Sequence, residues 1–177
     1  MRITISGKAG SGKSTIAKLL SKKLKLKHYS IGDLMRSMAA EKGISLLELN
    51  KLAEKDRSID FELDEKLRNL GKKENNFIVD GRLTAFFIPH ADARVFLDAD
   101  DKVRAKRILG DKRQHESNET LKSTINNIHK REQSEKKRYM KYYKVSYLDP
   151  KLYNLMIDTS DMAPEEIVAR IAEFVKK

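Results

Sequence analysis

The chain has 177 residues and no cysteine, and its 37 Lys and Arg against 26 Asp and Glu give a formal net charge of +11. This length suits one domain with a substantial core, and the absence of cysteine excludes disulfides and thiolate metal sites. The sequence has no signal-peptide core and no apolar run long enough to span a bilayer, so we expect a cytoplasmic protein with no membrane partner.

The basic excess has two interpretations. Nucleic-acid binding is one, but the lysines are spread along predicted helices, as at Lys22, Lys23, Lys136 and Lys137, where a solvated face is the commoner arrangement. No aromatic-rich binding pattern accompanies the charge. Because polyanionic nucleotides explain the positive net charge equally well, we do not expect nucleic acid as the main ligand. We also expect the protein to be a monomer.

A glycine-rich loop follows the first predicted strand. Residues 2–6 supply a β-branched strand, residues 7–14 match the pattern G-x-x-x-x-G-K-[ST], and an apolar stripe at helical spacing follows from Ile16 to Leu24. Glycines let consecutive backbone N–H groups turn toward an anion at a helix N-terminus, whose dipole favours negative charge. The alternative is a glycine-rich turn that binds nothing, but it does not explain why the loop lies between a predicted strand and a predicted helix.

The loop predicts a site for a nucleoside triphosphate. Lys13 can reach the β and γ phosphates, and the Ser14 hydroxyl is placed to bind a Mg²⁺ ion that bridges the same oxygens. The residues expected to contact ATP are Gly7, Lys8, Ala9, Gly10, Ser11, Gly12, Lys13, Ser14 and Thr15.

A helical insertion is predicted at residues 33–71, after a short strand at 27–30. Its first helix covers 33–40. Its second begins at Ser45, which forms a capping box with Glu48, and its third begins with Asp60 as N-cap and ends at Gly71.

The rest of the chain alternates strands and helices. Strands are predicted at 76–80, 94–98 and 155–158, with helices at 101–109, 119–143 and from Pro164 to Phe174. The polar stretch 110–118 is a loose loop or a lid. This order predicts an α/β fold in which helices flank a five-stranded parallel sheet and ligands bind at the carboxyl ends of the strands. We expect one domain over 1–177, with core segments 1–32, 72–109 and 144–177.

Four segments together resemble nucleoside monophosphate kinases. They are residues 7–14, 30–36, 80–82 and 131–139, and the resemblance runs from residue 1 to about 171 and is strongest to cytidylate kinases of the archaeal type. It implies a P-loop kinase, with a helical NMP-binding insertion and a small lid, that transfers the γ-phosphoryl group of ATP to CMP or dCMP. Two alternatives stay open: an adenylate or other monophosphate kinase, and an RNA-associated ATPase or assembly factor.

The resemblance also implies roles for particular residues. Transfer between two anions needs positioning and charge neutralisation rather than a general base, and guanidinium groups bind phosphate oxygens in pairs. Arg36 would hold the acceptor phosphate, Arg131 would lie between the two phosphates, and Arg82 and Arg138 would reach the phosphate or base of CMP. Asp80 would order the hydration shell of the magnesium ion.

Further assignments complete this set. Lys13, Arg107, Arg113 and Arg131 are the catalytic candidates, and Ser30, Asp60 and Glu135 join the substrate-binding candidates. The resemblance also makes 110–118 the lid, which we expect to close and bring Arg113 to the transferred group.

Two positions depart from the family pattern. Leu67 stands where a glutamine usually follows the pair Asp60 and Asp64, and Asp111 stands where a second lid arginine is usual, so that Arg113 or Lys112 is the candidate replacement. By residue type alone, Arg104 is expected to be a solvated surface charge, as Arg36 also could be, and Asp80 could merely cap a turn. The four histidines have no metal-like spacing.

Overall fold

The computed structural model describes residues 1–111 and 120–176. Most of the predicted lid, and with it Lys112 and Arg113, lies outside the described residues.

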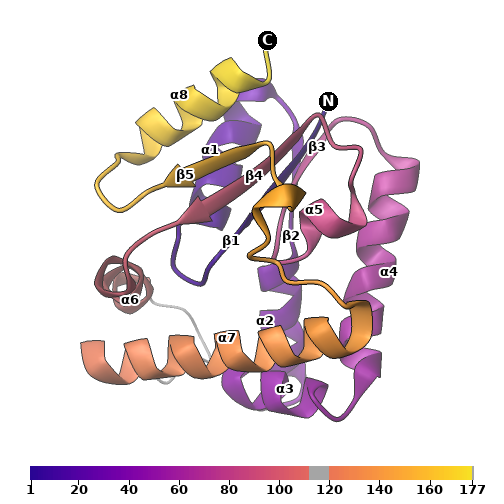
Figure 1. Ribbon diagram of the computed structural model, residues 1–177, viewed down its shortest axis with the longest axis vertical. Coiled ribbons are helices and arrows are strands. Elements are labelled where there is room, and N and C mark those ends of the chain that lie inside the picture. Colours follow the sequence, from indigo (N-terminus) through magenta and orange to yellow (C-terminus); the bar gives the residue numbers. More distant parts are fainter. Residues whose placement is uncertain (112–119, 177) are drawn as a thin grey trace.

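A parallel β-sheet forms the centre of the molecule (Figure 1). Its strands are β1 (Arg2–Gly7), β2 (Lys27–Ser30), β3 (Phe77–Asp80), β4 (Ala93–Asp98) and β5 (Leu155–Asp158), in the order β2-β3-β1-β4-β5. All neighbours pair in parallel, so the predicted five-stranded parallel sheet is confirmed. Side chains on both faces of the central strands are buried, as expected for a sheet covered by helices on each side.

Strand register brings the polar strand ends to one edge. β1 pairs Ile5 with Asp80 of β3 and Gly7 with Leu97 of β4, and β2 pairs Ser30 with Asp80. The phosphate loop, Ser30 and Asp80 therefore meet at the carboxyl edge of the sheet, where α/β folds place their ligands.

Helices cover both faces of the sheet. On one face α1 (Lys13–Leu24) and α8 (Pro164–Phe174) pack against apolar residues of β1, β4 and β5. On the other, the short helix α5 (Thr84–Phe87), α7 (Leu121–Tyr143) and the 3-10 turn η1 (Pro150–Leu152) enclose an aromatic cluster. Helix α6 (Asp101–Gly110) lies beside α7, and α7 crosses beyond the carboxyl ends of the strands (Figure 1). The short elements α5 and η1 were not predicted.

The helical insertion contains α2 (Ile31–Glu41), α3 (Leu46–Ala53) and α4 (Arg57–Lys73), which share a small core of their own with Ala39, Leu49 and Ile59 at its centre. The capping box between Ser45 and Glu48 is present. Helix α3 also packs against α7, so the insertion is in contact with the helix that crosses beyond the strand ends.

The predicted start of α4 is wrong. Asp56, not Asp60, is its N-cap, and the Asp56 side chain accepts a hydrogen bond from the Ser58 N–H at 2.9 Å. Asp60 lies in the first turn and is buried, and the helix continues past Gly71 to Lys73. Both aspartates suit a cap by residue type, and the pairing of Asp60 with a distant arginine, described below, decides between them.

None of the helices in these two described ranges has the length and apolar character needed to cross a bilayer.

Candidate active site

The phosphate loop is held tightly between β4 and α6. Gly10 has a φ of +77°, and a Cβ there would lie 2.5 Å from the Arg104 carbonyl oxygen. At Gly7 a Cβ would lie 2.1 Å from the Leu97 carbonyl oxygen. The backbone can take this path only without side chains at these two positions, because the contacts are with main-chain atoms that cannot move aside. The loop predicted from its glycine spacing therefore has the shape of a backbone cradle.

Lys13 opens α1 directly under this cradle. Its Nζ donates to the Lys8 carbonyl oxygen at 2.7 Å, across the loop. Burial, together with the nearby Arg82 guanidinium, lowers the pKa of Lys13 well below its usual value, although Asp80 opposes this shift. An anionic group bound in the loop would favour the charged form of this lysine.

Asp80 is fixed by three partners at the end of β3. Its Oδ2 accepts from the Ser14 hydroxyl at 2.8 Å and from the Ser30 hydroxyl at 3.2 Å, and its Oδ1 lies 2.7 Å from His28 Nε2. Only 1% of Asp80 is exposed. A buried carboxylate beside a loop serine offers the oxygen ligands that Mg²⁺ prefers, directly or through water. The residues therefore fit the ion expected from the sequence, and Asp80 does more than cap a turn.

Arg82 links the phosphate loop to α7. Its Nε donates to Glu135 Oε2 and its Nη1 donates to the Gly7 carbonyl oxygen, each at 2.7 Å. Burial works against the charged form of Arg82, but the Glu135 carboxylate raises the pKa of this guanidinium above its usual value. Burial likewise works against the charged form of Glu135, but Arg82 helps to hold the pKa of this carboxyl below its usual value. The pair is therefore charged on both sides.

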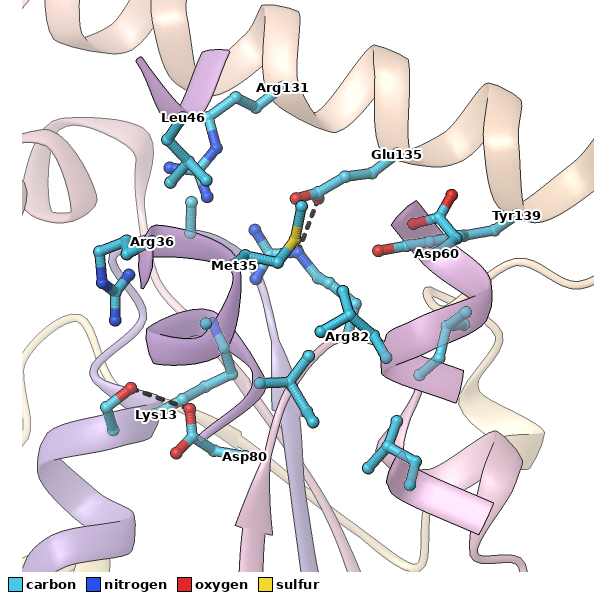
Figure 2. Close-up of a pocket in the computed structure, with 18 of the residues that line it drawn as sticks. Lys13, Met35, Arg36, Leu46, Asp60, Asp80, Arg82, Arg131, Glu135 and Tyr139 are labelled. Atoms are coloured by element: carbon cyan, nitrogen blue, oxygen red, sulfur yellow. Dashed lines mark hydrogen bonds and ion pairs between the residues drawn. The ribbon is translucent and has the colours of Figure 1, made fainter. Parts of the chain in front are cut away.

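A single pocket joins these groups. It encloses about 850 Å³, part of it open to solvent, and Figure 2 shows side chains from the loop, the insertion and α7 turned into it. Arg36 of α2, which is paired with Asp33, and Arg131 of α7 line it together with Arg82. The pocket walls also include Lys13, Ser14, Met35, Leu46, Asp60, Leu63, Asp64, Leu67, Asp80, Glu135 and Tyr139.

Two carboxylates of α4 mark the end of the pocket away from the loop, where Figure 2 shows Asp60 beside Tyr139. Burial raises the pKa of Asp64 to about 6, and the negative charge of Asp60 raises it further. The Tyr143 hydroxyl, which donates a hydrogen bond to Asp64, has the opposite effect on this pKa. Burial also raises the pKa of Asp60, and Arg138 opposes that shift. This end is both acidic and poorly solvated.

Arg138 lies behind this acidic end. Its Nε donates to Asp60 Oδ2 at 2.8 Å, and its Nη1 donates to the Asn50 carbonyl and side-chain oxygens at 3.0 Å each. It is 1% exposed, and its buried Nη2 has no hydrogen-bond partner among residues 1–111 and 120–176. The sequence did not indicate that Arg138 would tie α7 to both α3 and α4.

A second pocket lies on the other side of the loop. Gly12, Thr15 and Arg107 line it together with Met162 and Pro164 near the start of α8. Arg107 is held there by hydrogen bonds from Nη1 to Thr159 Oγ1 at 2.9 Å and from Nη2 to the Thr159 carbonyl oxygen at 2.6 Å. Gly10 borders both pockets, so the loop separates two binding spaces.

One expectation from residue type is wrong. Arg104 is not a solvated surface charge, because it is 1% exposed and donates to the Ala9 carbonyl oxygen of the loop and to Glu132 of α7. The sequence also left Tyr143 and His28 without a role, although each contacts a carboxylate of the pocket. No local signal marks such residues, since their partners are more than 50 positions away in the chain.

The fold and the site define a class of protein. A phosphate loop between the first strand and helix of a parallel sheet, facing a pocket with three arginines, is the arrangement of a P-loop kinase. Residues 2–161 match the model of the cytidylate kinase-like family, and the chain belongs to that family.

Individual relatives agree with this assignment. The chain is 38% identical to a cytidylate kinase of Natronomonas pharaonis, over 99% of this chain and 89% of that protein. It is 39% identical to a cytidylate kinase of Sulfurisphaera tokodaii, over 94% and 91%. Among solved structures, a shikimate kinase of Bacteroides thetaiotaomicron covers the whole chain with 99% of its own length, at a TM-score of 0.67 and 15% identity, and so shares the fold.

Proposed function

We propose that this protein transfers the γ-phosphoryl group of ATP to CMP, and also to dCMP, giving CDP or dCDP and ADP. The observation that carries the proposal is the single pocket in which Lys13 and three arginines at one end face two buried aspartates at the other. A nucleoside monophosphate has matching chemistry, with an anionic phosphate at one end and a hydrogen-bonding base at the other.

On the donor side, the loop residues 7–15 would hold the phosphates of ATP. Lys13 would neutralise charge on the β and γ phosphates as the γ group leaves. Ser14, and Asp80 through water, would hold a Mg²⁺ ion, which would supply positive charge against the phosphates. The second pocket, with Arg107 in its wall, is the space for the rest of the donor nucleotide, because it continues from the other side of the loop.

On the acceptor side, three arginines from separate elements would bind the monophosphate. Arg36, Arg82 and Arg131 reach the pocket from α2, the end of β3 and α7, so they can surround an anion rather than contact one face of it. A phosphate is already ionised near neutral pH, so the site needs no general base. The arginines would instead reduce the repulsion between the two nucleotides as they line up.

At the far end, the hydrogen-bonding groups suit cytosine. Its exocyclic amine donates and would be accepted by the carboxylates of Asp60 or Asp64. Arg138 would act from behind this end, because its Nε holds Asp60 by a hydrogen bond of 2.8 Å. Uracil would place a carbonyl oxygen against the carboxylates, which leaves buried acceptors facing each other. Ser30 and Glu135 would act indirectly, by holding Asp80 and Arg82.

We also propose that the active form is a monomer and that the protein is cytoplasmic, a location that a cysteine-free chain fits. Size-exclusion chromatography with light scattering would test the first point.

The central test is a coupled assay of ADP release with CMP, dCMP, UMP, AMP and GMP at equal concentrations. We expect CMP and dCMP to give the highest kcat/KM. Asp64→Asn should lower kcat/KM for CMP by about tenfold or more, since a carboxylate acceptor is lost. The ratio of kcat/KM for CMP to kcat/KM for UMP should fall as well. Asp161→Asn, at an exposed position, is the matched control. A higher rate with AMP than with CMP would indicate an adenylate kinase, and ATP turnover that needs RNA and ignores monophosphates would indicate the RNA-associated alternative.

A further inference from the structure

Arg104 of α6 is enclosed between the phosphate loop and α7. Its Nη1 donates to the Ala9 carbonyl oxygen at 3.1 Å and to Glu132 Oε1 at 2.5 Å, and its Nη2 donates to Asp101 Oδ1 at 2.5 Å. The side chain borders neither pocket, so it does not meet the nucleotides directly. Burying a guanidinium is costly unless charge and hydrogen bonds compensate it. Two carboxylates and one loop carbonyl do so for Nη1 and Nη2, while the buried Nε has no partner among the described residues.

The carbonyl held by Arg104 belongs to the same peptide as the N–H of Gly10. The described backbone has no cis peptide bond, and in a trans peptide the C=O and N–H point in opposite directions. A carbonyl fixed toward Arg104 therefore turns the Gly10 N–H away from α6. Because Gly10 borders both pockets, this N–H is among those that can meet the phosphates. Glycine allows many peptide orientations, so an outside contact is needed to select one.

The second link of Arg104 runs to α7. Glu132 directly follows Arg131 and lies three residues before Glu135. Both of these neighbours line the first pocket, in which we place the acceptor monophosphate. One turn earlier, His129 Nε2 lies 2.6 Å from Asp101 Oδ2, a second polar contact between α7 and α6. A change in α7 when Arg131 engages the acceptor would therefore reach Arg104 through Glu132.

The apolar contacts follow the same route. Ala9 of the loop packs in one buried cluster with Ala105 and Ile108 of α6 and Ile128 of α7. The loop tip, α6 and α7 thus form a continuous packed unit, which can transmit a displacement instead of absorbing it.

We propose that Arg104 is a positioning residue that aims the Gly10 N–H at the donor phosphates, and that Glu132 couples this orientation to acceptor binding on α7. The identity of the two nucleotides rests on the proposed function. ATP should bind more tightly when the acceptor pocket is filled, and the acceptor should gain the same factor from ATP, since such coupling is reciprocal.

Calorimetric titration of the full chain with a non-hydrolysable ATP analogue, with and without saturating CMP, tests both parts. Arg104→Lys keeps the charge but loses the fork that spans Ala9 and Glu132, and should weaken analogue binding about tenfold while CMP affinity alone changes less than about twofold. Glu132→Gln keeps an oxygen that can accept from Arg104, so analogue binding without CMP should stay within about twofold. It loses the charge that holds Arg104 to α7, so most of the gain from CMP should disappear. Lys106→Gln, exposed on the same helix, is the control, and thermal unfolding confirms that each variant is folded.

Two results would overturn the proposal. Analogue binding by a folded Arg104→Lys variant that equals that of Lys106→Gln would refute the positioning role, and an undiminished gain from CMP in Glu132→Gln would refute the coupling. If Arg104→Lys does not fold, Arg104→Gln is titrated in its place and Glu132→Gln still decides the coupling. Titration with the ATP analogue alone does not depend on which monophosphate is the acceptor. A wrong assignment of CMP would instead appear as no effect of CMP on the wild-type protein, and the monophosphate selected by the rate assay would then replace it.

Discussion

Asp64→Asn should make the folded protein more stable at pH 8. Burial raises the pKa of this carboxyl from 3.8 to about 6, so the folded chain binds a proton more tightly than the unfolded chain does. Stability from this group is therefore fully present below pH 4 and is lost as the pH rises from about 4 to about 6. Above that range the ionised carboxylate lowers the free energy of unfolding, and an amide removes this cost.

The size of the effect follows from the two pKa values. Their difference corresponds to roughly 3 kcal/mol when both states are ionised. Solvent at the mouth of the pocket screens part of this, so we expect a gain of roughly 1–2 kcal/mol for Asp64→Asn. The Tyr143 hydroxyl can still donate to the amide oxygen, so this hydrogen bond need not be lost.

Urea unfolding followed by circular dichroism at several pH values between 4.5 and 8 measures this gain. The advantage of Asp64→Asn should grow with pH and become constant above about pH 7, while Asp161→Asn, at an exposed position, should show no such trend. A loss of stability in Asp64→Asn that is the same at every pH would refute the reasoning, because the hydrogen bond from Tyr143 would then outweigh the cost of the buried charge. A gain in stability with a loss of CMP turnover would mean that Asp64 is kept for binding.

Three further predictions concern the loop and the buried ion pair. Lys13→Ala should lower kcat by at least about a hundredfold in steady-state assays, since its charge acts mainly as the γ group leaves, and near-normal turnover would exclude the loop as the donor site. Ser14→Ala should raise the magnesium concentration needed for half-maximal turnover after chelation and re-addition, and an unchanged titration would place the ion elsewhere. Glu135→Ala should lower the free energy of unfolding by about 3–5 kcal/mol, because Arg82 would be left as a buried charge without its carboxylate; urea unfolding measures this, and a loss below about 1 kcal/mol would show that water replaces the carboxylate.

Local patterns in the sequence were enough for the framework of the molecule. The spacing of glycines at 7–14, the apolar runs at 76–80 and 94–98 and the capping box at Ser45 each depend on neighbours a few residues away, and all appear in the structure. The register of a parallel sheet then carries Ser14 and Asp80 to the same edge, so the predicted magnesium pair could be expected to meet.

What the sequence alone determined is therefore the α/β class, the phosphate loop and its place at the carboxyl edge of the sheet. The tertiary structure decided which polar residues are buried and with whom. Asp60 and Arg138 are 78 positions apart and Arg104 and Glu132 are 28 apart, and each pair forms only after α4, α6 and α7 have packed. Hydrophobic periodicity reports which face of a helix is covered, but a buried charge is tolerated only where a distant partner compensates it, and no local pattern records that partner.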